Sequence, residues 1–86
     1  MTYTLQIPKT VQKQLQKISE PFHGQIIENL QQLKNDPRFG NAIKMKGSEG
    51  YRLRVGNYRI LYNINDTEET ITLRRIAHRR EVYRSP

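Results

Sequence analysis

The fold of this chain is decided by the stretch Tyr51-Arg52-Leu53-Arg54-Val55-Gly56-Asn57-Tyr58-Arg59-Ile60-Leu61-Tyr62. Apolar residues alternate with polar ones on both sides of Gly56-Asn57, the pattern of two half-buried strands joined by a two-residue hairpin turn. That turn predicts that Arg54 pairs with Arg59. The apolar side chains then cover the core, and the arginines gather on the opposite face of the sheet.

Other strands are predicted on both sides of this hairpin. Residues 3–7 and 71–73 also alternate with a period of two, which indicates an N-terminal strand and the last strand of a three-stranded antiparallel meander. The polar residues 65–69 form the second hairpin loop. Residues 36–50 are rich in glycine and are predicted to be a loop, which is tied to the core by Phe39, Ile43 and Met45.

Two helices are predicted between the first strand and this loop. Val11, Leu15 and Ile18 follow helical spacing and form the buried stripe of the first. The second is predicted to use Ser19 as its N-cap and to end near Asn35, because Pro37 disfavours a helical residue before it. Its buried stripe consists of Ile26 or Ile27, Leu30 and Leu33. The sequence thus predicts a single α+β domain over residues 1–86, with a sheet packed on a two-helix hairpin and a short C-terminal tail.

Size and composition restrict the kind of site that this domain can carry. A chain of 86 residues buries only roughly 60–65 % of its unfolded surface, so a catalytic site is expected on an open groove or sheet face. The net charge of +7 favours a polyanionic partner such as RNA, DNA, an acidic protein or an anionic membrane. There is no cysteine, no apolar stretch of signal-peptide length and no membrane span, so we expect a cytoplasmic protein.

The positive charge of the C-terminal part comes from arginine alone. The last 36 residues contain eight arginines and no lysine. Arginine carries a planar fork of donors that matches phosphate and carboxylate, so this segregation indicates recognition of such groups. The alternative is a solvated sheet face on which arginine stems cover aliphatic neighbours.

The arginines outside the hairpin are placed by the same alternation. It puts Arg74 on the arginine face and Arg75 on the core side, unless a bulge or an early strand end changes the parity. The tail from His78 onward is expected to leave the sheet at the rim of the arginine face. In the loop, Lys44 and Lys46 are expected to lie beside whatever the arginines bind.

At these residues the chain resembles the RelE family of bacterial toxins from toxin–antitoxin modules. The resemblance is carried by Lys44-Met45-Lys46-Gly47-Ser48-Glu49-Gly50, by the hairpin, and by Ile76-Ala77-His78-Arg79-Arg80-Glu81-Val82-Tyr83. It spans nearly the whole chain. The related ParE toxins share a version of the hairpin, and the tail favours the RelE branch.

The resemblance implies a ribosome-dependent endoribonuclease that cleaves mRNA in the ribosomal A site and is neutralised by a RelB-like antitoxin. The family's transition-state arginine falls on Arg59, its tail arginine on Arg79 and its tail tyrosine on Tyr83. Two basic positions before the turn fall on Arg52 and Arg54, where the best-known member has lysines. The predicted catalytic residues are therefore Arg54, Arg59, Arg79 and Tyr83, and the predicted RNA-binding residues are Lys44, Lys46, Arg52, Arg74, His78 and Arg80.

These residue types suit RNA cleavage without a metal ion. In that reaction a 2′-hydroxyl attacks the adjacent phosphate, and arginines stabilise the charge that develops there. Arginine is a poor proton carrier, so the proton transfer is left to Tyr83, His78, the RNA or the ribosome. Tyr83 could instead stack on a base. No zinc-ligand spacing and no nucleotide-binding glycine loop occur, so neither metal nor cofactor is predicted.

Two other functions fit the same residues. One is a ParE-like toxin that acts by binding a protein such as gyrase, and this would leave Arg79 and Tyr83 without a chemical role. The other is a non-catalytic basic module that coats RNA or ribosomes. New mRNA ends after incubation with translating ribosomes would indicate the endoribonuclease, inhibition of supercoiling the ParE-like toxin, and binding without cuts the non-catalytic module.

Overall fold

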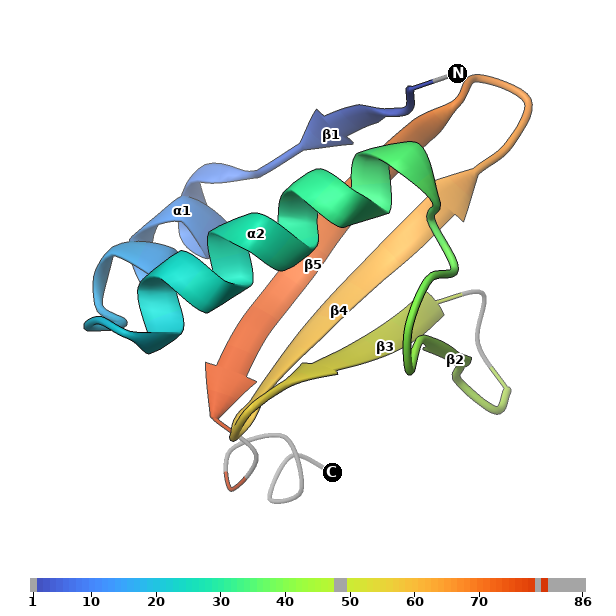
Figure 1. The fold of residues 1–86 in the computed structure, drawn as a ribbon. Helices are drawn as coiled ribbons and strands as arrows, with labels where there is room; N and C mark the ends of the chain where they lie inside the picture. Colours follow the sequence, from blue (N-terminus) through green and yellow to red (C-terminus); the bar gives the residue numbers. More distant parts are fainter. Residues whose placement is uncertain (1, 48–49, 79, 81–86) are drawn as a thin grey trace.

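The computed structural model describes residues 2–47, 50–78 and 80, and this part of the chain forms two layers, with two helices on a five-stranded sheet (Figure 1). The elements are β1 (Thr4–Gln6), α1 (Lys9–Gln16), α2 (Phe22–Asn35), β2 (Ile43–Lys44), β3 (Gly50–Val55), β4 (Tyr58–Asn65) and β5 (Thr70–His78). The predicted α+β class and the order strand, helix, helix, meander are confirmed. None of the described helices has the length and apolar character that crossing a bilayer requires.

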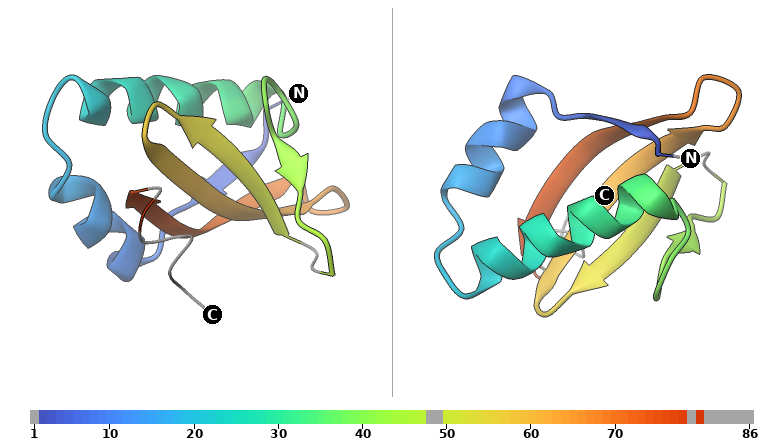
Figure 2. Two further views of the ribbon diagram at one scale, coloured as in Figure 1. Left: turned by 90° about the horizontal axis from the view of Figure 1, so that it is seen from below. Right: turned by 45° about the horizontal axis from the view of Figure 1, so that its top comes forward.

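The sheet has the strand order β1-β5-β4-β3-β2. β1 runs parallel to β5, and the other neighbours are antiparallel. Both helices lie on the same face of this sheet, α1 against β5 and α2 against β3 (Figure 2). Among the described residues, no helix packs on the opposite face of the sheet.

The core lies between the helices and the sheet. Its apolar residues are Val11, Leu15, Ile18, Ile26, Leu30, Leu33, Leu53, Val55, Ile60, Tyr62, Ile71, Leu73 and Ile76. The predicted helical stripes belong to it, as do Leu53, Val55, Ile60 and Tyr62 of the hairpin, while the hairpin residues Tyr51 and Tyr58 are partly buried and pack against it. Tyr62 is the largest fully buried side chain among the described residues; its hydroxyl donates to the Pro37 carbonyl at 2.7 Å, and burial raises its pKa to about 12.

The start of α2 differs from the prediction. The helix begins at Phe22, Pro21 occupies the N-cap position, and no side chain caps it there. Ser19 lies too far ahead of the first turn for the predicted role. The Glu20 carboxylate accepts the Gly24 N–H at 2.9 Å instead, which satisfies one of the amide groups that a helix leaves without an internal partner. The predicted end at Asn35 is confirmed.

The segment predicted to be a loop contains the short strand β2. Ile43 pairs with Arg52 on β3 and is 53 % exposed, so the prediction that it ties the loop to the core is wrong. The reason is register, since Ile43 falls on the same side of the sheet as Arg52. Phe39 does pack against the core, as predicted, and Met45 is partly buried.

At the end of the sheet far from the Gly56-Asn57 turn, four polar side chains form what we call the polar latch: Tyr3, Arg38, Tyr51 and Asp66. Arg38 Nη2 donates to Asp66 Oδ2 at 2.8 Å, and the Tyr3 hydroxyl donates to Asp66 Oδ1 at 2.6 Å. Arg38 Nε also donates to the Tyr51 hydroxyl at 3.1 Å. The hydrogen bonds from Arg38 and Tyr3 hold the pKa of Asp66 below its usual value. The latch therefore ties together the residue before β1, the segment after α2, β3 and the β4–β5 turn.

Candidate functional site

The face of the sheet turned away from the helices carries a group of arginines, which we call the arginine face. β3 contributes Arg52 and Arg54, and β4 contributes Arg59, all at positions that alternate with core residues. The three strands β3, β4 and β5 contain no Asp or Glu. No carboxylate of these three strands therefore neutralises the positive charge on this part of the sheet.

Arg54 and Arg59 are direct partners across β3 and β4. The predicted hairpin register is confirmed at every pair from Tyr51 and Tyr62 to Val55 and Tyr58. Gly56 has φ +59°, so it supplies the positive φ that the first turn position of a primed turn requires. The two-residue turn is what brings the two arginines opposite each other.

The two members of the pair differ in exposure. Arg54 is exposed, whereas Arg59 is only 3 % exposed, and its Nη1 donates to the Tyr58 carbonyl at 3.3 Å. A phosphate that approaches this face meets Arg54 first and reaches Arg59 only if neighbouring atoms move. Arg59 then offers a cation in a site from which water is largely excluded, where electrostatic interactions are stronger than in bulk water.

Sequence reasoning missed Asn41, which positions Arg54. Its Oδ1 accepts the Arg54 N–H at 2.8 Å, and its Nδ2 donates to the Arg54 carbonyl at 3.2 Å. The side-chain amide thus pairs with the outer edge of β3 as a neighbouring peptide group would. Both backbone groups of Arg54 point away from β4, which makes Arg54 and Arg59 a non-hydrogen-bonded pair, with Cα atoms about 4.5 Å apart. An asparagine in the loop before a strand was the only available signal.

A bulge in β5 decides between Arg74 and Arg75. Leu61 pairs with Arg75 and Tyr62 pairs with Leu73, so Arg74 is an extra residue without a cross-strand partner position. Strict alternation would have placed Arg75 on the core side, and the bulge is the exception that the sequence analysis allowed, because it shifts the alternation by one residue. Arg74 and Arg75 both line a hollow of about 260 Å³ with Leu61 and Met45, so both reach the arginine face.

His78 lies on the other side of the sheet. It pairs with Tyr58, and the two rings meet edge to face with centroids 5.5 Å apart. Tyr58 in turn contacts Phe22 of α2. β5 runs through His78, so the prediction that a tail begins there at the rim of the arginine face is wrong.

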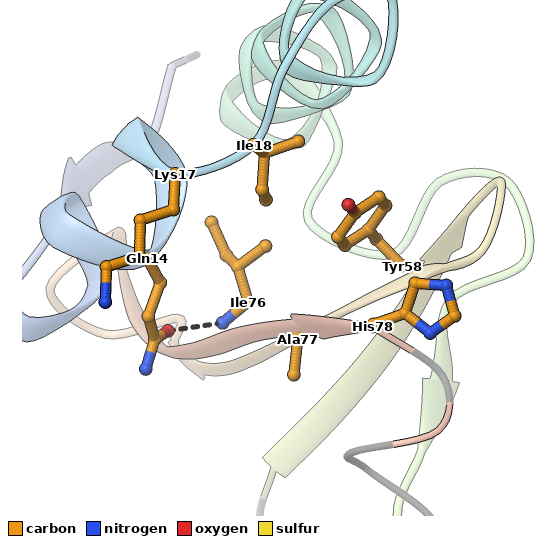
Figure 3. A pocket seen from close by; sticks show the side chains of 7 residues that line it. All are labelled: Gln14, Lys17, Ile18, Tyr58, Ile76, Ala77 and His78. Carbon is orange, nitrogen blue, oxygen red and sulfur yellow. Dashed lines mark hydrogen bonds between the residues drawn. The ribbon is translucent and has the colours of Figure 1, made fainter.

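Figure 3 shows the surroundings of His78, a groove of about 420 Å³ between α1 and the end of β5. Gln14 of α1 crosses this groove, and its Oε1 accepts the Ile76 N–H at 2.8 Å. The Arg80 N–H donates to His78 Nδ1 at 3.3 Å, so the neutral ring carries its proton on Nε2. His78 therefore faces the helix side, away from the paired arginines.

The remaining predicted site residues are placed less fully. Lys44 pairs with Tyr51, whose ring stacks on buried Tyr62, so the register puts Lys44 on the helix side of the sheet. Lys46 follows β2 and is exposed. Arg80 is exposed too, whereas Arg79 and Tyr83 lie outside the described residues.

The sequence of this chain matches a family described as "ParE toxin of type II toxin-antitoxin system, parDE" over residues 5–83. The chain belongs to this family of toxins. It is also similar to proteins named after RelE, as the resemblance in the sequence predicts. Toxin RelE3 of Methanocaldococcus jannaschii is 36% identical over 90% of this chain and 78% of its own length. Toxin RelG of Mycobacterium tuberculosis is 29% identical over 98% of this chain and 99% of its own.

Solved structures support the same assignment. One similar chain comes from the crystal structure of the archaeal RelE–RelB complex from Pyrococcus horikoshii OT3, with a TM-score of 0.82 and 29% identity. The match covers 92% of this chain and 97% of that one. The helices, sheet and hairpin described above are therefore those of a RelE-type toxin.

Proposed function

We propose that this protein is a ribosome-dependent endoribonuclease that cleaves mRNA in the A site and thereby halts translation. The observation that carries the proposal is the direct pairing of Arg54 with Arg59 on a sheet face whose strands contain no acid. Like charges in opposed positions destabilise a sheet by up to about 1 kcal/mol. A scissile phosphate bound there replaces that repulsion with two charge-assisted contacts.

The proposed reaction begins with attack by the 2′-hydroxyl of the RNA on the adjacent phosphorus. A new P–O bond forms, the bond to the 5′-oxygen of the next nucleotide breaks, and a 2′,3′-cyclic phosphate remains. Arg54 and Arg59, joined by Arg79, stabilise the additional negative charge on the phosphate oxygens. The attacking hydroxyl loses a proton and the leaving oxygen gains one, so the reaction balances without a cofactor and needs no metal ion.

Proton transfer is assigned to Tyr83 rather than to His78. The arginines keep their protons at neutral pH, so another group has to act. His78 lies on β5 and on the helix side of the sheet, the face opposite to that of Arg59. Cations around a tyrosine favour its phenolate, which accepts the 2′-hydroxyl proton. A general base contributes typically about 10²–10⁴-fold to the rate.

We further propose a RelB-like antitoxin as the partner that keeps the protein silent in the cytoplasm. The P. horikoshii RelE structure is a complex with RelB. An acidic segment that covers the arginine face would complement its charge. Expression of the free protein is then expected to stop growth, and coexpression of the neighbouring antitoxin to restore it. Vigorous growth of cells that make soluble, uncombined protein would contradict the toxin assignment.

Cleavage is tested by incubating purified protein with translating ribosomes and mapping new mRNA 5′ ends. Cuts confined to A-site codons are expected, with strong loss in Arg59→Ala and in Tyr83→Phe. Lys13→Gln on α1 is the matched control, because it removes an exposed cation away from the arginine face. Equal losses in the control would indicate general electrostatic attraction alone.

The ParE description of the matching family supports a second candidate, a toxin that binds a protein such as gyrase. A supercoiling assay with purified gyrase separates the two. Inhibition of supercoiling, without new mRNA ends and without sensitivity to Tyr83→Phe, would establish the second candidate. Binding to ribosomes with neither effect would identify a non-catalytic module.

A further inference from the structure

Beside the paired arginines, the arginine face contains the hollow lined by Met45, Leu61, Arg74 and Arg75, which we call the Leu61 hollow. Its volume is about 260 Å³. Leu61 is paired with Arg52 on one side and with Arg75 on the other, so it stands between two arginines of the neighbouring strands. The hollow therefore combines an apolar floor with cationic walls.

The position of Leu61 relative to Arg59 suits one nucleotide. The two residues lie two positions apart on β4 and share a face of the sheet. A strand rises roughly 3.3 Å per residue, so they are separated by about 7 Å along it. That is comparable to the separation between a backbone phosphate and the base of an adjoining nucleotide.

We propose that the Leu61 hollow is a nucleobase subsite, which holds the unstacked base next to the phosphate bound by Arg54 and Arg59. Leu61 and Met45 contact the ring, and Arg75 and Arg74 lie against its face and edge. This inference rests on the proposed RNA cleavage and adds a residue that recognises the substrate, Leu61, to the residues that act on the phosphate.

The chemistry of the hollow favours a base over other occupants. Pockets for drug-sized ligands measure roughly 300–1,000 Å³, and this hollow is smaller, which suits a single planar ring system. A bare phosphate gains nothing from an aliphatic floor, whereas a base has an apolar face and polar edges. Proteins that bind single-stranded RNA splay out bases and stack them on planar or apolar side chains, including arginine. If Leu61 served only as an aliphatic surface covered by arginine stems, its position would be explained, but the open hollow beside it would not.

The test is a double-mutant cycle between Leu61 and the RNA. Ribosomes are programmed with mRNAs in which each nucleotide of the A-site codon is in turn replaced by an abasic ribose, and single-turnover cleavage rates are compared for the wild-type protein and Leu61→Thr. Threonine suits a strand and removes the apolar surface without touching the core face. Ile43→Thr is the matched control, since Ile43 is exposed on the same side of the sheet but does not line the hollow.

At one codon position, removing the base is expected to slow the wild-type protein by roughly 5- to 100-fold, the range of a base-stacking contact. Leu61→Thr should slow cleavage of the intact mRNA by a similar factor. Removing the base at that position should then slow the Leu61→Thr variant only slightly further. Leu61→Met should retain most of the wild-type rate, and Ile43→Thr should leave the wild-type response to every abasic mRNA intact.

Independent, multiplicative effects of Leu61→Thr and base removal at every position would overturn the subsite while leaving RNA cleavage established. An absence of cuts by the wild-type protein would overturn the proposed function and the subsite with it. If Leu61→Thr weakens binding of the antitoxin and leaves cleavage unchanged, the hollow is a protein-docking site and the inference is wrong.

Discussion

At the scale of single residues, Arg54 and Arg59 have the same charge but different surroundings. Arg59 is 3 % exposed and Arg54 is exposed. A charge in a site with little water interacts more strongly and is harder to replace, and lysine lacks the planar fork of guanidinium. The pair is therefore expected to be functionally unequal, with Arg59 dominant.

We predict that Arg59→Lys lowers the single-turnover cleavage rate by about 10²–10³-fold, the usual cost of losing one preorganised donor to a transition-state oxyanion. Arg54→Lys, at the exposed member, should cost less than about 10-fold because solvent screens it. Rates on programmed ribosomes measure both, and thermal unfolding shows whether either variant has lost its fold. If both variants fold and lose the same factor in cleavage rate, the difference in burial between Arg59 and Arg54 does not make them functionally unequal.

Asn41 gives a second prediction at this scale. Asn41→Ala removes two hydrogen bonds to the Arg54 backbone, which are worth about 1 kcal/mol together at an exposed site. We expect slower cleavage because the edge of β3 beside Arg54 loses its support. The measurement is the cleavage rate together with the free energy of unfolding in urea.

The control for Asn41 is Asn29→Ala, which removes the hydrogen bond from Asn29 Nδ2 to the Gln25 carbonyl on α2. It should leave cleavage unchanged. Asn41→Asp keeps the acceptor for the Arg54 N–H and should recover part of the rate. If Asn41 and Asn29 variants behave alike, Asn41 does not position the site.

At the scale of elements, the hairpin turn controls how the arginines meet. A Cβ at Gly56 would lie 3.5 Å from the Phe22 ring, and its φ of +59° is unfavourable for other residues. We predict that Gly56→Ala lowers the free energy of unfolding by about 1–2 kcal/mol and slows cleavage through loss of the register between Arg54 and Arg59. Urea denaturation and the ribosome assay measure the two effects.

Gly47→Ala provides the comparison for Gly56. Gly47 also has a positive φ, +73°, but its Cβ would meet nothing within 4 Å, and the residue lies outside the hairpin turn. Gly47→Ala should lower the free energy of unfolding. Its cleavage rate should fall only in proportion to the fraction of protein that is unfolded. A Gly56 variant that cleaves as well as the Gly47 variant would show that the turn residue does not set the site.

The bulge in β5 leads to a prediction about a deletion. Without Arg74, Leu73 would still pair with Tyr62 and Arg75 with Leu61, so every remaining side chain of β5 would keep its face. We expect the Arg74 deletion to fold with unchanged or higher thermal stability and to bind RNA more weakly. Deletion of Thr72, which lies in the regular ladder opposite Asn63, should unfold the domain. Unfolding of both variants would show that the bulge is needed for the fold.

At the scale of the whole molecule, the polar latch joins segments that lie far apart in the sequence, from Tyr3 to Asp66. The hydrogen bonds from Arg38 and Tyr3 lower the pKa of Asp66 from its usual 3.8. Because the folded pKa is the lower one, the carboxylate stabilises the fold above pH 3.8, and this contribution is lost as the pH falls through the folded pKa. We therefore predict a fall in melting temperature below about pH 4, which is smaller in Asp66→Asn.

The control for the latch is Glu28→Gln, on the exposed side of α2. It should keep the acid dependence of the wild-type protein, measured as melting temperature from pH 2 to pH 6. If Asp66→Asn and wild type lose stability in parallel, the latch does not contribute to acid unfolding. The site itself lies on the arginine face, so cleavage at neutral pH should survive the Asp66 change in the folded fraction.

The sequence alone determined both helices, the strands β1, β3 and β4, the presence of β5, and the central pair of the site. Period-two alternation and Gly56-Asn57 were enough to place Arg54 opposite Arg59, because a two-residue turn leaves a single register in which the apolar side chains are buried. The buried stripes of the two helices were also predicted correctly from the helical spacing of apolar residues. These features depend on neighbours in the sequence.

The tertiary structure decided what depends on contacts between distant segments. The bulge moved Arg75 to the arginine face, β2 exposed Ile43 and turned Lys44 to the helix side, and Asn41 joined the edge of β3. No local sequence pattern predicts these outcomes, because the position of a bulge and the pairing of an edge strand depend on how complete strands pack and pair with one another. His78 shows the same limit. It is the last residue of β5 instead of the first of a tail, and its ring contacts the ring of Tyr58 on the neighbouring strand.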